Sequence, residues 1–448
     1  MSTFPVSLTA PRRRCWRLSI VLALVLGLGC GADESAEPAA GKAPKPAASA
    51  SAAPPAPAAE PTRALVLSLA RFPKIEAGTN PVPLPATLEF LVPRGAHGEW
   101  EMVALEDPES NVFHKAMELS PAQPGGPPRL LTAAGTAATL KTWQKSDGKL
   151  VPTTHWKKDF GGRFSRMRDV EVADLYGDGS EALVVATHDQ GVVAILRPDG
   201  QGGYEVFEID LEPDTFVHEI EIGDLDGDGV LEVYATPSEP NRLDGSEQKG
   251  TVVRYVPAAG EGRVVVADLG MRHAKEILVE DLDGDGRDEL YVVVEGKIDP
   301  ETRQLTEKVE ILRFDADTDP AGGTVVAEIP DRLSRFLTVG DIEGDGQKEM
   351  VVAAFSSGLW LLRPNAEGPW KLELIDGRSG GFEHAAILAD LDADGRDELY
   401  AASDQEKLVR RYRWNGKRLV GEVIYRRKDP GSVFTWNLMP VAIELVPR

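Results

Sequence analysis

The chain has 448 residues, enough for two average domains or for one large repeat array. Its net charge of −23 argues against sequence-independent binding to DNA or RNA, because such binding depends on a basic surface. The two cysteines, Cys15 and Cys30, both lie near the N-terminus, so we expect no disulfide bonds in the folded part of the chain.

Residues 1–30 have the pattern of an export signal. A basic stretch ending at Arg17 precedes an apolar run at 18–28, which is shorter than the ~20 residues needed to span a bilayer. The end of this run resembles a bacterial lipobox, although Gly27 stands where that family has Leu. The resemblance implies a lipid on Cys30 and a lipid-anchored protein of the bacterial cell envelope, at the outer membrane on its periplasmic or surface side. Cleavage without lipidation is the alternative.

Residues 31–62 are mostly Ala and Pro with a few Glu, Lys and Ser. This composition has too few large apolar side chains to form a core, and its prolines favour extended backbone. The sequence therefore predicts a disordered tether between the membrane anchor and a folded domain at 63–448.

Five short acidic loops recur in the rest of the chain, and their first residues are spaced 50, 57, 60 and 49 residues apart. Each loop has oxygen-bearing side chains at alternate positions with small residues between them. A backbone folds around a hard cation such as calcium in this way, and a period of this length indicates stacked supersecondary units. The loops begin at Asp174, Asp224, Asp281, Asp341 and Asp390.

Each acidic loop is followed by short β-branched and aromatic runs, separated by Gly, Pro, Asp and Asn. Such runs are typical of strands joined by tight turns, and no segment after the signal has a helical period. We therefore predict a unit of four antiparallel strands, with the acidic loop between its first and second strands.

The third strand of this unit recurs seven times, more often than the loop. Segment 113–119 supplies a sixth first strand, and 429–439, which echoes 107–117, supplies a seventh. The C-terminal strand has no strands after it and the N-terminal unit has no first strand, so the two are predicted to complete one sheet. The predicted fold is all-β, a seven-bladed β-propeller, with an open solenoid as the alternative. The third strands are 86–93, 138–145, 191–198, 250–257, 308–315, 358–365 and 407–414.

The loops, Asp-x-Asp-Gly-Asp-Gly followed by an acid and a hydrophobic strand, resemble the FG-GAP or VCBS repeat. This repeat builds the integrin α-subunit propeller and occurs in many bacterial surface proteins. The resemblance covers about residues 64–448 and is strongest at the loops. It implies calcium in loops on one face of a propeller, and ligands on the opposite face or the rim.

Four loops carry complete sets of oxygen ligands, so we expect about four calcium sites, held by carboxylates and by a backbone carbonyl at the seventh position. The first loop departs from the pattern, because Tyr176 replaces an acid between Asp174 and Asp178 and Ala182 replaces the last acid. A structural role for calcium, pinning a turn in each blade, is favoured over a ligand-binding role. The predicted ligands are Asp224, Asp226, Asp228, Val230 and Glu232; Asp281, Asp283, Asp285, Arg287 and Glu289; Asp341, Glu343, Asp345, Gln347 and Glu349; and Asp390, Asp392, Asp394, Arg396 and Glu398.

A second pattern lies six residues before each loop, where the residue is basic or a histidine. The equivalent position in the sixth first strand is also a histidine, and in the closing strand it is Thr435, next to Trp436. First strands of a propeller are innermost, so these residues are predicted to surround the axis at the end opposite the loops. They could bind an anion such as a uronate, sulfate or phosphate, could hold a transition metal, or could pair with neighbouring acids as strand caps. We call the six residues the mouth ring: His114, Arg168, His218, Lys275, Arg335 and His384.

Three functions fit these patterns. The first is a membrane-tethered, calcium-stabilised and non-enzymatic module that binds or adheres to a glycan or a protein, with Trp436 stacking on the ligand. The second is a polysaccharide lyase or another sugar-modifying enzyme that uses the mouth ring. The third is a structural subunit of an envelope complex. The sequence has no serine-hydrolase elbow, phosphate loop or zinc-protease motif, which favours the first.

Overall fold

The computed structural model describes residues 61–74, 83–94, 99–122, 125–135, 138–161, 165–188, 190–239, 242, 245–365 and 368–447. The predicted export signal, the lipidation of Cys30 and nearly all of the tether lie outside these residues. Contacts group Pro57–Arg448 into one compact unit. Within the described part of the chain, no helix is long and apolar enough to cross a membrane.

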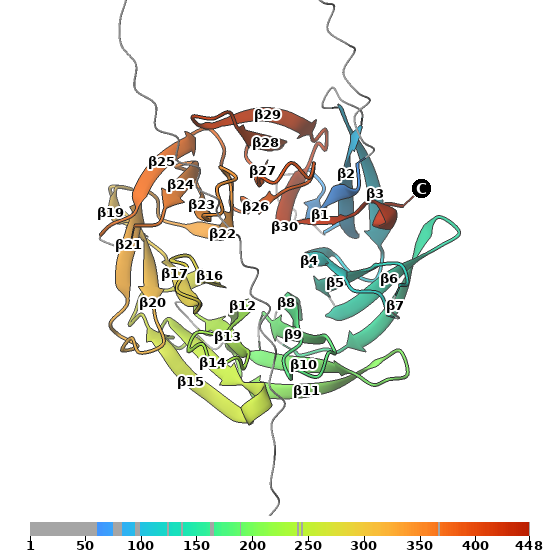
Figure 1. Ribbon diagram of the computed structural model, residues 1–448, viewed down its shortest axis with the longest axis horizontal. Coiled ribbons are helices and arrows are strands. Elements are labelled where there is room, and N and C mark those ends of the chain that lie inside the picture. The colour runs from blue at the N-terminus through green and yellow to red at the C-terminus, as the bar shows by residue number, and fades with distance from the viewer. Residues whose placement is uncertain are drawn as a thin grey trace, which may run out of the picture. The chain divides into compact units, whose positions relative to one another are not determined.

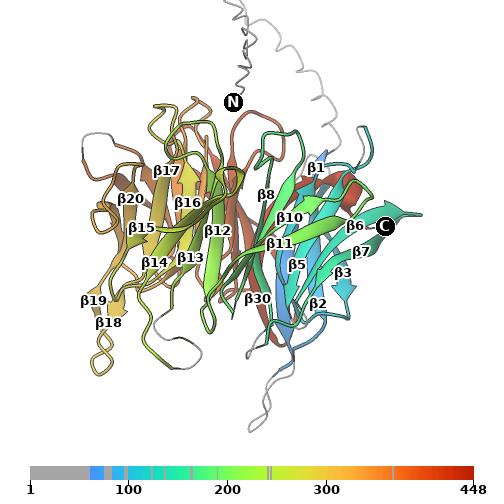
Figure 2. The same ribbon diagram turned by 90° about the horizontal axis from the view of Figure 1, so that it is seen from below.

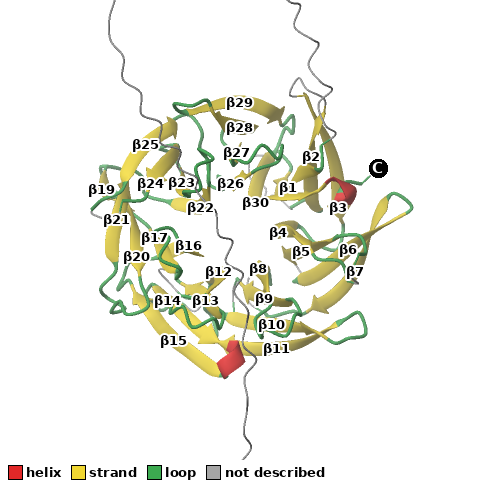
Figure 3. Cartoon of the chain, in the orientation of Figure 1, coloured by secondary structure: helices red, strands yellow, loops and turns green. Residues whose placement is uncertain are grey.

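The compact unit is built from antiparallel sheets, as predicted (Figure 3). The first contains eight strands, in the order β3-β2-β1-β4-β5-β6-β7 with β30 paired to β1. A single residue pair, Ala70 and Val112, joins β1 to β4, so this sheet consists of two four-stranded halves. Its strands are β1 (Arg63–Phe72), β2 (Ala86–Arg94), β3 (Glu99–Asp107), β4 (Val112–Leu119), β5 (Arg129–Gly135), β6 (Thr139–Ser146), β7 (Lys149–Lys157) and β30 (Ser432–Ala442).

Five four-stranded sheets follow in chain order, each with its strands paired in sequence. The third of them carries a small hairpin, β18 (Lys297–Ile298) and β19 (Leu305–Glu307), and two 3-10 turns occur at η1 (Pro257–Ala259) and η2 (Ile443–Leu445). The sheets are β8 (Met167–Ala173), β9 (Ala182–Thr187), β10 (Val192–Pro198) and β11 (Tyr204–Leu211); β12 (Val217–Gly223), β13 (Glu232–Pro237), β14 (Thr251–Val256) and β15 (Glu261–Asp268); β16 (Ala274–Glu280), β17 (Glu289–Val294), β20 (Val309–Phe314) and β21 (Thr324–Ile329); β22 (Ser334–Gly340), β23 (Glu349–Ala354), β24 (Leu359–Arg363) and β25 (Lys371–Asp376); and β26 (Ala386–Ala389), β27 (Glu398–Ser403), β28 (Leu408–Trp414) and β29 (Leu419–Arg426).

The sheets follow one another around a common axis (Figure 1), and the first strand of each lies nearest to it. These inner strands are β4, β8, β12, β16, β22, β26 and β30, and each contacts the inner strand of the next sheet, with β30 contacting β4. Seen from the side, the strands run between the two faces of the unit (Figure 2). The start of an inner strand and the acidic loop after it therefore lie toward opposite faces.

The second strands form the core between neighbouring sheets. All six residues are buried in β9, β13, β17, β23 and β27, so these strands pack on both faces. This burial explains why their sequences are continuously apolar. A strand covered on both faces has no solvent-facing side, so polar residues do not alternate with apolar ones. Outer strands such as β15 are mostly exposed and mark the rim.

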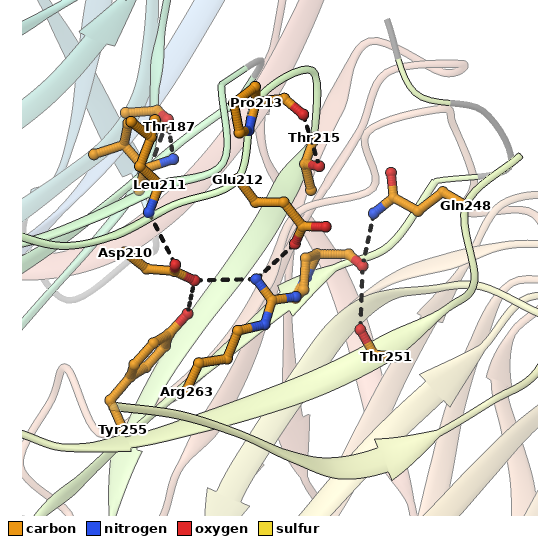
Figure 4. A network of polar contacts seen from close by, with 12 residues as sticks. Thr187, Asp210, Leu211, Glu212, Pro213, Thr215, Gln248, Thr251, Tyr255 and Arg263 are labelled. Carbon is orange, nitrogen blue, oxygen red and sulfur yellow. Dashed lines mark hydrogen bonds and ion pairs between the residues drawn. The ribbon is translucent and has the colours of Figure 1, made fainter. Parts of the chain in front are cut away.

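Polar side chains also connect neighbouring sheets at the rim (Figure 4). The Arg263 guanidinium on β15 contacts Asp210 Oδ2 at 3.1 Å and Glu212 Oε2 at 2.6 Å, so it connects β15 to the end of β11 in the sheet before it. The Tyr255 hydroxyl donates to the same Asp210 oxygen at 2.5 Å, and both carboxylates have partners. We assign this network to holding the sheets together, because each of its charges is paired.

Candidate functional site

The acidic loops lie between the first and second strands, as predicted, and three of them bring carboxylates together. In the third loop, one oxygen each of Asp281, Asp283, Asp285 and Glu289 lie within 4.8 Å of one another. The second and fifth loops form smaller groups within the same distance, and the fourth forms no such group among its described residues. The smaller groups are Asp224, Asp226 and Asp228, and Asp390, Asp392 and Glu398.

The first Asp of each loop also shapes the turn. Asp281 accepts hydrogen bonds from the backbone N–H groups of Gly284 at 2.7 Å and Gly286 at 2.9 Å. Gly286 has a φ of +90°, a conformation that a side chain would strain, so the glycine is required by the turn. In the first loop, Asp174 accepts similar hydrogen bonds from the backbone N–H groups of Asp178 and Gly179, although this loop lacks the complete set of ligands. The loop fold therefore does not depend on all the acids.

Arginines from the third strands contact the loops, a feature that the sequence analysis missed. Arg313 lies 2.8 Å from Asp283 and 3.3 Å from Glu289, and Arg254 lies 2.7 Å from Glu232. Arg363 lies 3.0 Å from Glu343, which gives the fourth loop a built-in counter-charge. An arginine at the end of most third strands was the available sequence signal.

The donor sets of the second, third and fifth loops fit a calcium ion. They contain only oxygen, and the last acid is buried with one oxygen already engaged: Glu289 Oε2 accepts from Tyr291 at 2.8 Å and from the Leu282 N–H at 3.2 Å. Burial and nearby carboxylates raise the pKa of Glu289 to about 6 and that of Glu398 to about 7. These carboxylates therefore repel one another, and a divalent cation would relieve the repulsion.

The mouth ring lies at the starts of the inner strands. The structure brings His114 within 3.3 Å of Arg168 and His218 within 3.2 Å of Lys275, each pair spanning two neighbouring strands. An isolated bridge joins His384 to Thr435. Five of the six ring residues are buried, and Arg335 is largely so. Several residues of the ring are therefore in direct contact with one another. The alternative, in which ring residues form ion pairs with Asp169, Glu219 and Glu276 at the next position, is not seen among the described ion pairs.

Two of those acids instead connect the inner strands to one another. Asp169 Oδ1 pairs with Lys115 at 3.0 Å, while Oδ2 accepts from the Ile220 N–H on the next inner strand at 3.0 Å. Glu276 accepts from the Leu337 N–H at 3.0 Å in the same way. The acid that follows Arg168 and the acid that follows Lys275 therefore link neighbouring sheets. The two ring residues themselves stay available for other contacts.

Arg168, His114 and Trp436 form one corner of the ring. The Arg168 guanidinium is buried, lies 5.1 Å from the Trp436 ring centroid, and donates to His114 Nδ1. It forms no ion pair with any described residue. Burial and the charge of Arg168 hold the pKa of His114 well below its usual value, so the imidazole is neutral.

The protonation of His114 follows from this contact. Because Nδ1 accepts from Arg168, Nε2 of the neutral imidazole carries the hydrogen and is a donor. Neither this Nε2–H nor the indole Nε1–H of Trp436 has a hydrogen-bond partner among the described residues, and both atoms are buried. Two buried donors with no acceptor therefore lie beside the Arg168 guanidinium, close to the axis. Unsatisfied buried donors are costly, and an anionic ligand would satisfy them.

The neighbouring corner contains His218, Lys275 and Glu239. His218 Nε2 lies 3.0 Å from Glu239 Oε1, which also accepts from Lys275. Nε2 also lies 3.2 Å from the Lys275 ammonium, which can only donate, whereas the nearer Glu239 carboxylate can only accept. We assign the hydrogen to Nε2 on the shorter contact, which leaves a free lone pair on Nδ1. His218 Nδ1 is buried without a partner in the described structure. Burial and the charge of Lys275 lower the pKa of His218 to about 3, so this imidazole is also neutral.

The other two ring residues are more fully paired. Arg335 pairs with Glu383 at 2.8 Å, an acid that the sequence analysis missed although it precedes His384. His384 Nδ1–H donates to the Ala354 carbonyl at 2.9 Å, and its Nε2 accepts from the Ser379 hydroxyl at 2.7 Å. We assign His384 to positioning the loop before β26, since both of its nitrogens are used.

The sequence comparison identifies part of this architecture. Residues 174–235 match the model of the FG-GAP-like repeat. This stretch is an FG-GAP-like repeat. It runs from the first acidic loop through the second and into β13, so the predicted resemblance is confirmed there. A search of curated proteins finds no match.

Solved structures are similar in fold to this chain at low sequence identity. A candidate 6-phosphogluconolactonase from Bacteroides uniformis is 12% identical, with a TM-score of 0.50 over 85% of this chain and 100% of that one. A second such candidate, from Bacteroides fragilis, is 11% identical with a TM-score of 0.48 over 85% and 98%. The periplasmic gluconolactonase of Pseudomonas aeruginosa is 14% identical with a TM-score of 0.45 over 84% and 99%. The likeness with a TM-score of 0.50 shows the fold alone and does not identify a substrate.

The comparison corrects two functional predictions. A non-enzymatic module for binding or adhesion was expected, and with it a chain that is not an enzyme. Both expectations are contradicted, because the Bacteroides uniformis protein that shares the fold is described as a candidate 6-phosphogluconolactonase. The absence of linear catalytic motifs is weak evidence against an enzyme, since residues on different inner strands meet only in the folded chain.

Proposed function

We propose that this protein is an enzyme that acts on an anionic sugar at the mouth ring, and that hydrolysis of a sugar lactone is the reaction to test first. The observation that carries the proposal is the unpaired Arg168 guanidinium beside the unsatisfied Nε2–H of His114 and Nε1–H of Trp436. These groups suit a carboxylate, a phosphate or the oxyanion of an ester under attack. We infer a lactone as substrate from the activity described for a protein with the same fold. We infer that the sugar is anionic from the donor groups of the site itself.

In the proposed reaction, His218 Nδ1 accepts a proton from a water molecule as the water oxygen attacks the lactone carbonyl. Glu239 holds the opposite Nε2–H, and its charge together with that of the bound anion opposes burial and Lys275, which lower the pKa of His218 to about 3 in the free protein. The donors at His114, Arg168 and Trp436 stabilise the negative charge on the former carbonyl oxygen. The ring C–O bond then breaks, the leaving oxygen receives the proton from His218, and the product is the open-chain acid. No co-reactant other than water is needed.

The experiment is a hydrolysis assay on glucono-lactone and on its 6-phospho form, with acid release followed in a pH-stat. The wild type is expected to hydrolyse at least one lactone faster than buffer does. Arg168→Met and His218→Asn should each reduce kcat/KM by at least about a hundredfold, which is the usual scale for losing one such group. His155→Asn is the matched control, because His155 lies on the outer strand β7. No acceleration by the wild type, or equal activity of all variants, would contradict the proposal.

We propose further that the sheets form seven blades of one closed propeller. The eight-stranded sheet divides at its single joining pair into two blades, and the other five sheets supply one blade each. The pairing of β30 with β1, from Arg63 with Ala442 to Phe72 with Ser432, supports closure by the two chain ends. A closed ring has no exposed sheet edge and fixes the distances between inner strands, which a site built from several of them requires.

We propose that calcium occupies the second, third and fifth loops and stabilises the turns there. The all-oxygen donor sets support this proposal, and the position of the loops toward the face opposite the mouth ring supports a structural role. The described carboxylates of the fourth loop do not gather as those of the other three loops do, so it would bind the ion more weakly.

A further inference from the structure

A cavity of about 270 Å³ lies beside the mouth ring, between the ends of β23 and β27 and the start of β30. Three phenylalanines line it, Phe355, Phe382 and Phe434, together with Asp404 and Lys407. The loops that form it lead into inner strands or out of second strands, so it opens on the same face as the mouth ring. Its volume is close to the lower end of the range for ligand clefts, which suits a small ligand.

The cavity is directly connected to the mouth ring. The Arg335 guanidinium lies 4.1 Å from the Phe382 ring centroid, and Phe434 precedes Thr435, the ring position of the closing strand. Asp404 Oδ1 accepts from the Thr435 N–H at 3.2 Å and from its hydroxyl at 3.3 Å. A ligand that extends beyond the mouth ring on this side therefore reaches the cavity next.

The lining combines an open aromatic ring with an unsatisfied acceptor. Phe382 is 43% exposed, a large fraction for an aromatic side chain that already contacts an arginine and Phe434. Asp404 Oδ2 is buried and has no hydrogen-bond partner among the described residues. Burial raises the pKa of the Asp404 carboxyl group, so a neutral hydroxyl suits it better than an anion does.

A glycine allows two loops of the cavity to approach closely. Gly381 has a φ of +155°, and a Cβ placed on it would lie 3.0 Å from both the Asp404 Cβ and the Asp404 backbone nitrogen. A side chain at this position would therefore press on Asp404. Gly381 lets the loop before β26 lie close to Asp404, and both residues line the cavity.

We propose that this cavity is a saccharide subsite that binds a neutral pyranose unit of the substrate, with the apolar face of the sugar on Phe382 and a hydroxyl on Asp404. The inference rests on the proposed function for the class of ligand, and it adds that the anionic sugar carries a second sugar unit. The Lys407 ammonium donates to the carbonyls of Asp429 and Gly431, which leaves one of its three hydrogens for a sugar hydroxyl.

Saturation-transfer NMR with the methyl glycosides of glucose, galactose and mannose tests the subsite without requiring catalysis. The wild type is expected to saturate at least one of these pyranosides. Phe382→Leu, which keeps an apolar side chain but removes the aromatic face, should weaken that binding about tenfold, and Asp404→Asn should weaken it as well. Phe207→Ala is the matched control, because Phe207 is 41% exposed on the outer strand β11, and it should bind as the wild type does.

The Arg168→Met variant separates this proposal from the proposed function. It should lose hydrolysis and keep pyranoside binding, because Arg168 does not line the cavity. Pyranoside binding without hydrolysis of any lactone by the wild type would support the subsite and contradict the lactonase. The absence of saturation transfer to all three pyranosides, or an equal loss in Phe207→Ala and Phe382→Leu, would overturn the subsite whatever the hydrolysis assay shows.

Discussion

Replacement of Arg427 tests whether the two chain ends are held together as we propose. Its side chain is 1% exposed and lies 3.1 Å from Glu89 Oε2 on β2, while its Nη1 donates to Thr435 Oγ1 on β30 at 2.8 Å. Arg427→Met leaves the Glu89 carboxylate, 6% exposed, without its only ion-pair partner among the described residues. Removing one member of a buried pair costs about 3–5 kcal/mol, so we expect a loss of that size in the free energy of unfolding.

Urea denaturation followed by tryptophan fluorescence and circular dichroism measures this loss, provided that the two signals change together. Arg94→Met is the control, because the Arg94–Glu101 pair is 55% exposed on both sides and should contribute less than about 1 kcal/mol. The double variant Arg427→Met with Glu89→Leu should recover most of the stability, since it leaves no buried charge unpaired. A cost for Arg427→Met no larger than that of the control would refute this reasoning.

Three other outcomes are expected. Chelation of calcium should lower the melting temperature, and Asp281→Asn should reduce that effect; unchanged melting and circular dichroism after chelation would exclude structural calcium. Burial lowers the pKa of His384 to about 4, from about 6.5 for an ordinary histidine, so the unfolded chain binds one more proton than the folded chain between these values. Stability should therefore be complete above about pH 6.5 and fall by up to about 3 kcal/mol toward pH 4, and His384→Gln should show a smaller fall in urea titrations. Gly250→Ala should destabilise the protein by more than about 2 kcal/mol, because its Cβ would lie 1.9 Å from the Arg272 carbonyl oxygen, whereas Gly262→Ala, with no atom within 4 Å, should be close to neutral in the same assay.

The sequence predicted the strands well because their signals are local. Continuous apolar runs marked the buried second strands, and the period of the acidic loops gave the repeating unit. The third strand predicted at 191–198, for example, corresponds to β10, and the closing strand predicted at 429–439 overlaps β30. Such patterns depend on neighbours along the chain, so they survive in a single sequence.

The candidate site was predicted only in part, because its chemistry depends on contacts between strands. The spacing located His114, Arg168 and His218 near the axis but gave no information about their partners. Glu239, which sets the tautomer of His218, lies 21 residues from it in sequence. The sequence likewise does not show that Arg168 has no carboxylate partner among the described residues of the folded chain. Function was mispredicted for the same reason, since reactive groups on separate strands form no linear motif.

A crystal structure with a phosphorylated aldonic acid, the product of the proposed hydrolysis, tests the central claim most directly. The account predicts that carboxylate or phosphate oxygens of this product accept hydrogen bonds from Arg168, from His114 Nε2 and from Trp436 Nε1, with the product's carbon chain near His218 Nδ1. A structure with no product bound near the axis, or with product bound only at the acidic loops or the rim, would contradict this claim.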